Sequence, residues 1–429
     1  MQNISRRIKD LHLPSLFFFL AALGVFSIQL VYNPGSLPLG FELGKVFMVQ
    51  MFAIIFFVAM FSFFLQRLFE ALSGNASNRT KLIISWWSNR VAAWGYPVLV
   101  LSCLLTVAYS PYLELSIFGS QFRMAGIYTQ VALIIISVFA YFGYKYINRK
   151  LLMLAILFPL IWQAMIGYLD ATSLTWELIQ TGYYVNGNFG QANFFAGSMN
   201  LGLALTLFIL VTRKKHTKYS LIGLISLVVL FLGAIYLSFS TGGLIFAGFL
   251  VAIAVFAKLP LSHVVKKFVL VALIPLFLAA ASWGVIANEP GRSSIWQATA
   301  QVIPSHALFG FGTDSLGEEI QKEGLLPGRY VDRAHNIYLD VIYTNGFFQL
   351  AIWLALAAYI TYKLWKSKAE QKKEAMPLLI ILLVFLLSGV FHEKSIYHSA
   401  EFMFTLGCLL SVLSWSPANS LRRKDKSAV

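Results

Sequence analysis

Residues 219–238 read YSLIGLISLVVLFLGAIYLS, an unbroken run without a charged side chain. Its length matches the ~20 residues that a helix needs to cross the hydrocarbon core of a bilayer. Comparable apolar runs lie on both sides of it, and together they predict an all-α, polytopic integral membrane protein with about 12 transmembrane helices. The expected spans are 13–32, 45–65, 91–110, 125–147, 151–169, 194–212, 219–238, 243–257, 268–287, 336–362, 376–391 and 400–415.

The composition of the chain excludes a soluble globular protein. Of the 429 residues, 58% are hydrophobic and 12% are charged, whereas soluble domains carry about 25% charged residues. The 37 Phe, 19 Tyr and 10 Trp suit a surface that faces lipid and its headgroup boundary. We therefore expect one multi-pass membrane domain over residues 1–429.

The net charge of +15 is explained by membrane orientation and predicts no nucleic-acid partner. When alternate connections are assigned to opposite sides, one side holds 26 of the 33 Lys and Arg residues and the other side holds 7. Cytoplasmic loops are rich in Lys and Arg, so both termini are predicted to be cytoplasmic. Membrane lipids are the expected surroundings, with anionic headgroups near the basic face.

The N-terminal stretch is predicted to be a membrane span and not a signal peptide, and the two cysteines are predicted to be unpaired. Arg6, Arg7 and Lys9 precede the apolar run 13–32, as in a signal peptide, but the run is long enough to span and no small-x-small cleavage pattern closes it. Cys103 and Cys408 lie inside apolar runs and imply no disulfide framework.

Two segments on the predicted outer side are long enough to carry chemistry: 170–193 and the large extracytoplasmic loop 288–335, which precedes the tenth span. In that loop, residues 293–303 show a helical apolar pattern. Ser315 and Glu318 have the spacing of a capping box, which predicts a second short helix. We expect the active site in this loop.

His335 is the most informative residue of the loop, because it stands where the polar segment enters an apolar helix. A histidine can take a proton from a hydroxyl near neutral pH, and Asp332 could orient its ring if the first turn is helical. The alternative is that His335 merely caps the helix start. Nearby arginines, whose guanidinium groups match phosphate oxygens, could equally pin the loop or extend toward the membrane surface.

A second group of polar residues lies at the mouth of the span 194–212, in the stretch Asn186-Gly-Asn-Phe-Gly-Gln-Ala-Asn193. Its amides could bind sugar hydroxyls or phosphate oxygens, although glycine and asparagine also form ordinary turns.

Metal and cofactor chemistry has no visible machinery in the sequence. His392, Glu393 and His398 lack the His-Glu-x-x-His spacing of a zinc site. There is no nucleotide-binding loop, nucleophile elbow or dinucleotide fingerprint. We expect no metal and no cofactor, and a donor substrate that arrives already activated.

Together these features resemble the O-antigen ligase/polymerase superfamily of bacterial membrane glycosyltransferases. The stretches that carry the resemblance are 118–126 (FGSQFRMAG), 187–193 (GNFGQAN), 291–296 (GRSSIW) with 308–312 (LFGFG), and 335–339 (HNIYL) followed by Asn345-Gly346.

The resemblance implies transfer of a glycan from an undecaprenyl-diphosphate carrier to an acceptor hydroxyl, such as that of the lipid A core, at the outer face of the bacterial cytoplasmic membrane. It implies that His335 and Arg292 are catalytic. The donor diphosphate would be bound by Arg123, Arg292, Arg333 and Arg329. Donor or glycan contacts would come from Gln191, Asn193, Asn188 and Asn336.

The sequence departs from the family pattern at Ser238-Phe-Ser-Thr-Gly-Gly243. Many relatives have an arginine here, and Thr241 cannot replace its charge, so that phosphate contact is missing or comes from elsewhere. A polysaccharide polymerase and a protein O-oligosaccharyltransferase of the same superfamily are the alternatives to a ligase. A lipid-linked glycan transporter or flippase, or a structural scaffold, would be a protein of another class.

Overall fold

The computed structural model describes residues 13–31, 43–73, 94–121, 123–172, 185–213, 215–288, 290–390 and 395–414. Within these ranges every regular element is a helix, which confirms the all-α prediction. The helices predicted as spans are α2 (Leu13–Ser27), α3 (Leu43–Ser73), α5 (Tyr96–Tyr109), α7 (Ile127–Gly143), α8 (Arg149–Ala171), α9 (Ala192–Thr212), α10 (Lys218–Leu237), α11 (Thr241–Lys258), α12 (His263–Asn288), α15 (Ile337–Lys366), α16 (Ala369–Ser388) and α17 (Ile396–Leu413).

Seven of these helices are long and apolar enough to cross a membrane: α3, α7, α8, α9, α10, α11 and α15. Three shorter apolar helices cover Pro14–Leu30, Tyr96–Tyr109 and His398–Leu413. Every apolar run of the sequence therefore coincides with a helix, and the chain has the character of a membrane protein. The twelve-span topology and its orientation remain predictions.

Helix α9 lies at the centre of the bundle. All its residues from Phe194 to Leu207 are buried, as expected for a helix that is hydrophobic on every side. It packs against α10, α11 and α16. A Cβ atom at Gly202 would lie 2.4 Å from the Phe231 ring of α10, so these two helices approach as closely as they do because residue 202 has no side chain.

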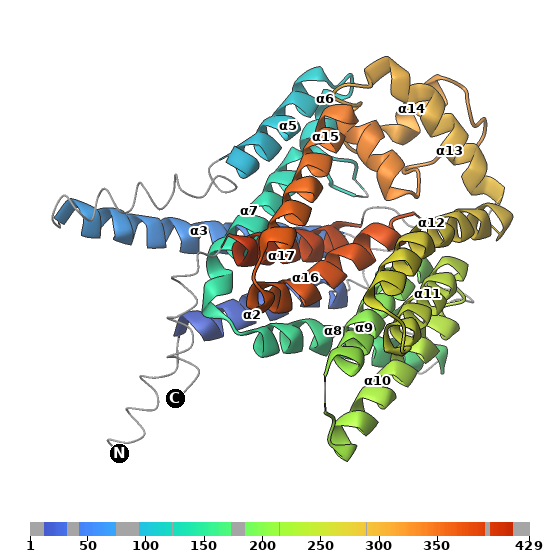
Figure 1. The fold of residues 1–429 in the computed structure, drawn as a ribbon. Coiled ribbons are helices and arrows are strands. Elements are labelled where there is room, and N and C mark those ends of the chain that lie inside the picture. Colours follow the sequence, from blue (N-terminus) through green and yellow to red (C-terminus); the bar gives the residue numbers. More distant parts are fainter. Residues whose placement is uncertain are drawn as a thin grey trace.

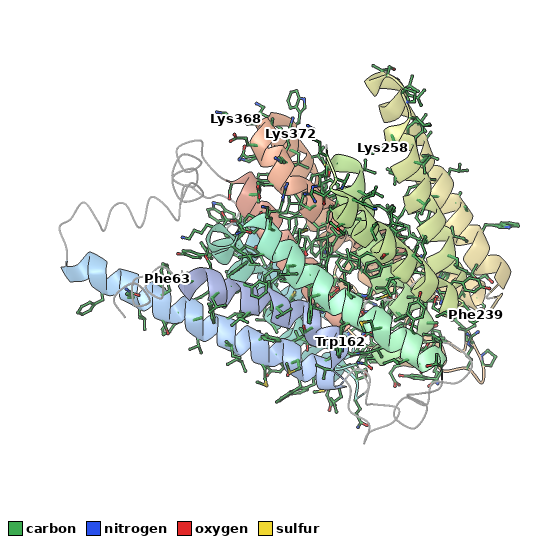
Figure 2. The ribbon with its side chains drawn as sticks, turned by 90° about the horizontal axis from the view of Figure 1, so that it is seen from below. Phe63, Trp162, Phe239, Lys258, Lys368 and Lys372 are labelled. Atoms are coloured by element: carbon green, nitrogen blue, oxygen red, sulfur yellow. The ribbon has the colours of Figure 1, made fainter. Side chains whose placement is uncertain are left out.

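The outer helices leave large apolar side chains uncovered. Phe69 of α3 is 74% exposed and Val229 of α10 is 62% exposed, with many similar residues along both helices. Soluble proteins rarely expose such continuous apolar surfaces, whereas hydrocarbon is a suitable solvent for them. Figure 2 shows Lys258, Lys368 and Lys372 along one edge of the molecule and Phe239 toward the opposite edge, as expected for connections assigned to different sides.

Two short helices of the large loop, α13 (Pro290–Val302) and α14 (Leu316–Lys322), form a small cap. Figure 1 shows α14 near α6 (Leu113–Phe118), with α13 between α14 and the end of α12. The helix predicted over 293–303 is thus confirmed. The prediction of a capping box at Ser315 is wrong. The Ser315 hydroxyl donates to the Gly312 carbonyl (3.0 Å) and makes no hydrogen bond to an amide of α14.

Helix α15 is broken near its beginning. Gly346 has a φ of +72° inside it, and a Cβ there would lie 2.3 Å from the Leu308 carbonyl oxygen. The segment 307–312 lies along this break: the Phe311 amide donates to the Tyr343 carbonyl (2.9 Å) and the Phe347 amide to the Ala307 carbonyl (2.8 Å). Backbone groups freed by a break must find partners away from water, and the large loop supplies them.

The predicted sidedness can be tested with single cysteines introduced at Lys258, Lys368 or Phe239 in a variant lacking Cys103 and Cys408. In right-side-out spheroplasts, a membrane-impermeant maleimide should label Phe239→Cys, whereas Lys258→Cys and Lys368→Cys should react only after the membrane is opened. Labelling of all three positions from one side would contradict the topology.

Candidate functional site

The turn that carries His335 is fixed from three directions. The Trp296 indole of α13 donates to the Ala334 carbonyl at 2.9 Å, and the Ala334 amide donates to an Asp340 carboxylate oxygen at 2.8 Å. The Ile337 amide donates to the Gly389 carbonyl at the end of α16 (2.8 Å). The loop, α15 and α16 therefore meet at this turn.

His335 itself has a φ of +53°. Residues other than glycine rarely adopt this left-handed conformation, and where they do they often lie at functional sites. Arg292 of α13 is buried, and its Nη1 lies 3.5 Å from the His335 carbonyl oxygen, which makes a weak hydrogen bond. The exposed Arg329 donates to the Gly291 carbonyl (3.3 Å), so the structure brings Arg292, Arg329 and His335 together.

The other two arginines of the predicted site form ion pairs with aspartates. The Arg123 guanidinium makes two contacts with one Asp332 carboxylate oxygen, at 2.8 and 2.9 Å. Arg333 contacts Asp314 at 2.7 Å, with 9% and 1% of the two side chains exposed. These carboxylates balance the charge of both guanidinium groups, so in this structure neither ion pair adds net positive charge.

The Asp314 carboxylate also binds the loop before α7. Besides Arg333, it accepts hydrogen bonds from the Ser120 amide (2.9 Å), the Ser120 hydroxyl (3.3 Å) and the Ala125 amide (3.0 Å). A buried carboxylate is tolerated when it is paired and hydrogen-bonded in this way. We call Asp314, Arg333, Arg123 and Asp332 the clamp, because it fastens the large loop to the segment 118–126.

The expectation that Asp332 orients His335 is wrong. Residues 331–336 are not helical, and α15 begins at Ile337. Asp332 therefore does not sit one helical turn from the ring and binds Arg123 instead. Asn336 takes the capping role, since its side chain accepts from the Tyr338 and Leu339 amides at 3.0 and 3.3 Å.

The amides of segment 186–193 contact neighbouring helices. Asn188 donates to the Leu30 carbonyl (3.0 Å), and its own carbonyl accepts from the Lys45 ammonium at 2.6 Å. Asn193 accepts from the Ser240 hydroxyl (2.6 Å), which in turn accepts from the Gly243 amide at 3.0 Å. Hydroxyls and amides thus occupy the turn beside Thr241. Gln191, at the start of α9, is half-buried.

Two cavities meet beside the clamp. A polar cavity of about 30 Å³, large enough for a water molecule, is lined by the clamp residues Arg123, Asp314 and Arg333 and by Asp340, Thr344 and Asn345 among others. An apolar cavity of about 450 Å³ lies between α5, α7, α15, α16 and α17. Both are lined by Gln130, Leu133 and Ser399, so the two spaces are neighbours.

The apolar cavity borders the lipid-facing surface. Its lining includes Leu354 of α15 (62% exposed) and Leu386 of α16 (39% exposed). Helix α15 packs mainly on α5, and α16 packs mainly on α17 and α9. The weak packing between α15 and α16 leaves room for the cavity, and an apolar chain could enter it from the membrane.

Tyr112 ties the cap to the end of α5 through its hydrogen bond to Glu319 (2.5 Å). Burial, and then that hydrogen bond, raise the pKa of the Tyr112 phenol well above its usual value. The phenol therefore stays protonated and keeps donating throughout the physiological range.

Sequence reasoning missed Asp314, whose partners Arg333 and Ser120 are distant in sequence, and Asp340, which accepts from the backbone amide of Ala334 rather than from a side chain. The group considered as a zinc site is His392, Glu393 and His398. His392 and Glu393 lie outside the described residues. Both ring nitrogens of His398 contact serine hydroxyls, at 2.8 and 2.9 Å. Among the described residues no group of three or more His, Cys, Asp or Glu side chains could hold a metal ion.

No family model matches the chain, and no curated protein matches it either. The resemblance to the O-antigen ligase/polymerase superfamily therefore remains a prediction from the motifs.

Breaking the clamp should destabilise the loop. Asp314→Asn would leave the buried Arg333 charge without its carboxylate, which typically costs ~3–5 kcal/mol. We expect a lower thermal midpoint in detergent and faster proteolysis within 290–335. Glu318→Gln, an exposed carboxylate in the same loop, is the matched control. Equal midpoints for both variants would show that the clamp contributes nothing.

Proposed function

We propose that this protein is a membrane glycosyltransferase, most simply O-antigen ligase-like, that moves a glycan from a polyprenyl-diphosphate carrier such as undecaprenyl diphosphate to an acceptor hydroxyl. The observation that carries the proposal is an apolar cavity that borders the lipid-facing surface and reaches the start of α15, next to the turn where Arg292 and Arg329 lie. A lipid-linked glycan has the same two-part character, with a long hydrocarbon tail joined to a charged diphosphate.

In this proposal the tail lies in the apolar cavity and the diphosphate lies near the turn 333–335. Arg292 and Arg329 are the cations best placed to meet it, because Arg292 contacts the His335 carbonyl and Arg329 contacts the Gly291 carbonyl beside it. Arg123 and Arg333 hold the surrounding backbone while paired with aspartates. They can reach the diphosphate only by loosening the clamp.

The reaction joins the acceptor oxygen to the anomeric carbon of the glycan and breaks the bond between that carbon and the diphosphate oxygen. His335 takes the hydroxyl proton, and the bond electrons leave with the polyprenyl diphosphate. Fixed cations stabilise the charge that develops on the leaving group, and holding donor and acceptor together supplies further rate. This chemistry requires no group beyond the side chains named here.

The related alternatives differ in the acceptor alone. Lipid A core, the end of a growing glycan or a protein hydroxyl would each suit the same donor site, so polymerase and protein O-oligosaccharyltransferase activities remain open. The location proposed for all three is the bacterial cytoplasmic membrane, with the reaction at its outer face.

The transporter alternative draws on the break in α15, because transporters bind substrates at discontinuous helices. Here, however, backbone groups at the break are hydrogen-bonded to the segment 307–312 and are not available to a substrate. The arginines also cluster in the outer loop. Both features favour an enzyme that works at the membrane boundary.

Removing the proposed base or cation should stop transfer. With purified protein in proteoliposomes and undecaprenyl-diphosphate oligosaccharide as donor, His335→Ala and Arg292→Ala should each lower the rate by about 10²-fold or more, as measured by mass spectrometry of products. His306→Ala, a half-buried histidine of the same loop that packs on Phe311, should keep the rate. Movement of labelled donor between leaflets without a glycosidic product would favour the transporter.

Filling the apolar cavity should weaken donor binding. Ala357 lines the cavity, and Ala357→Trp should raise the KM for the lipid-linked donor while leaving the protein folded. Ala358→Trp, on the same helix and outside the cavity lining, should behave as wild type. A KM that is unchanged for Ala357→Trp would argue against a donor tail in this cavity.

A further inference from the structure

Glu401 of α17 is a buried carboxyl group that the proposed reaction does not use. Its exposed fraction is 0%, and neither carboxylate oxygen has a hydrogen-bond partner in the described part of the chain. An isolated anion in such a place costs so much free energy that the group takes up a neutralising cation or proton instead.

Gln163 of α8 is buried in the same way. It too is 0% exposed, and both its amide nitrogen and its amide oxygen lack partners among the described residues. Buried polar atoms are almost always hydrogen-bonded. Two side chains that each leave two polar atoms unsatisfied therefore point to a shared partner or to each other.

The packing of α17 directs Glu401 toward α8. His398 bonds Ser198 of α9, while Phe404 packs against Phe26 of α2. Glu401 stands three residues from each, so its side chain points between these two directions, into the space bounded by α2 and α9. Helix α8 packs on both α2 and α9, so it closes the far side of this space, and Gln163 belongs to its buried face.

Each of the two side chains lies within about two turns of an end of its helix. With a rise of 1.5 Å per residue, Gln163 lies about 12 Å from the end of α8 at Ala171, and Glu401 lies about 8 Å from the start of α17 at Ile396. The same short helix η5 (Gly187–Phe189) covers both ends: a Cβ atom at Gly187 would lie 2.4 Å from Gln163 Nε2, and Phe189 stacks on the His398 ring.

Few other titratable groups face this space. Helices α2, α7 and α9 and the short helix η5 contain no Asp, Glu, Lys, Arg or His, and the charged residues of α16 stand in its first two turns, far from Glu401. Helices α15 and η4 (Tyr144–Tyr146) also pack against α17; their charged residues are Asp340, Lys363 and Lys366 on α15 and Lys145 on η4. Other titratable groups on the surrounding elements include His398 and Cys408 on α17 itself, Lys45 of α3, Tyr141 of α7 and Asp170 of α8.

We propose that Glu401 and Gln163 form a proton-binding site inside the membrane. Glu401 takes a proton from water and becomes a neutral acid. The two side chains make no hydrogen bond to each other in this structure, so each must change rotamer to pair. The Glu401 O–H group then donates to the Gln163 amide oxygen, and the Gln163 amide nitrogen donates to the Glu401 carbonyl oxygen. This arrangement gives each of the four atoms a hydrogen-bond partner. A deprotonated Glu401 could accept from the Gln163 amide nitrogen but could not donate to the Gln163 amide oxygen. The proton thereby joins α17 to α8 beneath η5, independently of the glycosyltransferase proposal.

Infrared spectroscopy of the full-length protein in lipid bilayers tests the site directly. At neutral pH the wild-type spectrum should contain the C=O band of a protonated carboxylic acid, and Glu401→Gln should lose it. Glu370→Gln, an exposed carboxyl at the start of α16, should leave the band unchanged. Retention of the band in Glu401→Gln, or its absence from wild type, would overturn the proposal.

Thermal melting gives a second readout, because Glu401→Gln imitates the protonated acid and should fold. A group protonated in the folded state loses its stabilisation as the pH rises, so the wild-type midpoint should fall relative to Glu401→Gln, by about 1–2 °C for each pH unit. Parallel profiles would overturn the proposal. So would a wild-type midpoint that rises with sodium at constant ionic strength, since it would identify a sodium site instead.

Discussion

The Asp314 carboxylate joins two parts of the chain, and the position of the candidate site depends on it. It binds the Arg333 guanidinium within the large loop and the backbone of the segment before α7. Because Arg333 is two residues from His335, fastening it also fixes the histidine. A loop of this length would otherwise lose its order to conformational entropy, so the buried ion pair and its hydrogen bonds set where the polar chemistry can occur.

The break in α15 adds a second constraint of the same kind. Backbone groups at membrane depth need partners within the protein, and the segment 307–312 provides them at Gly346. The loop is therefore built into the helical bundle, and the polar cavity at the break adjoins an apolar cavity that borders the lipid. The apolar cavity also reaches the start of α15, beside the turn where Arg292 and Arg329 lie. This juxtaposition is the physical basis for proposing a substrate with a hydrocarbon tail and an anionic head.

The sequence was sufficient to predict the helices, because apolar runs near 20 residues have few other uses. It also indicated α13, through its periodic apolar residues, and drew attention to His335 and Arg292. It could not predict the pairing of Arg123 with Asp332 or of Arg333 with Asp314, since these partners lie about 200 and 20 residues apart and nothing local links them. The predicted capping box does not form because the Ser315 hydroxyl donates instead to the Gly312 carbonyl in the turn before α14.

The most direct test of the account is photo-crosslinking of the purified protein in bilayers with a polyprenyl diphosphate that carries a diazirine on its tail, followed by peptide mapping. The account predicts crosslinks to cavity-lining residues of α15, α16 and α17, such as Ala357 and Phe402, and competition by unlabelled polyprenyl diphosphate. Crosslinks confined to the lipid-facing surfaces of α3 and α10, or crosslinks insensitive to competitor, would contradict it.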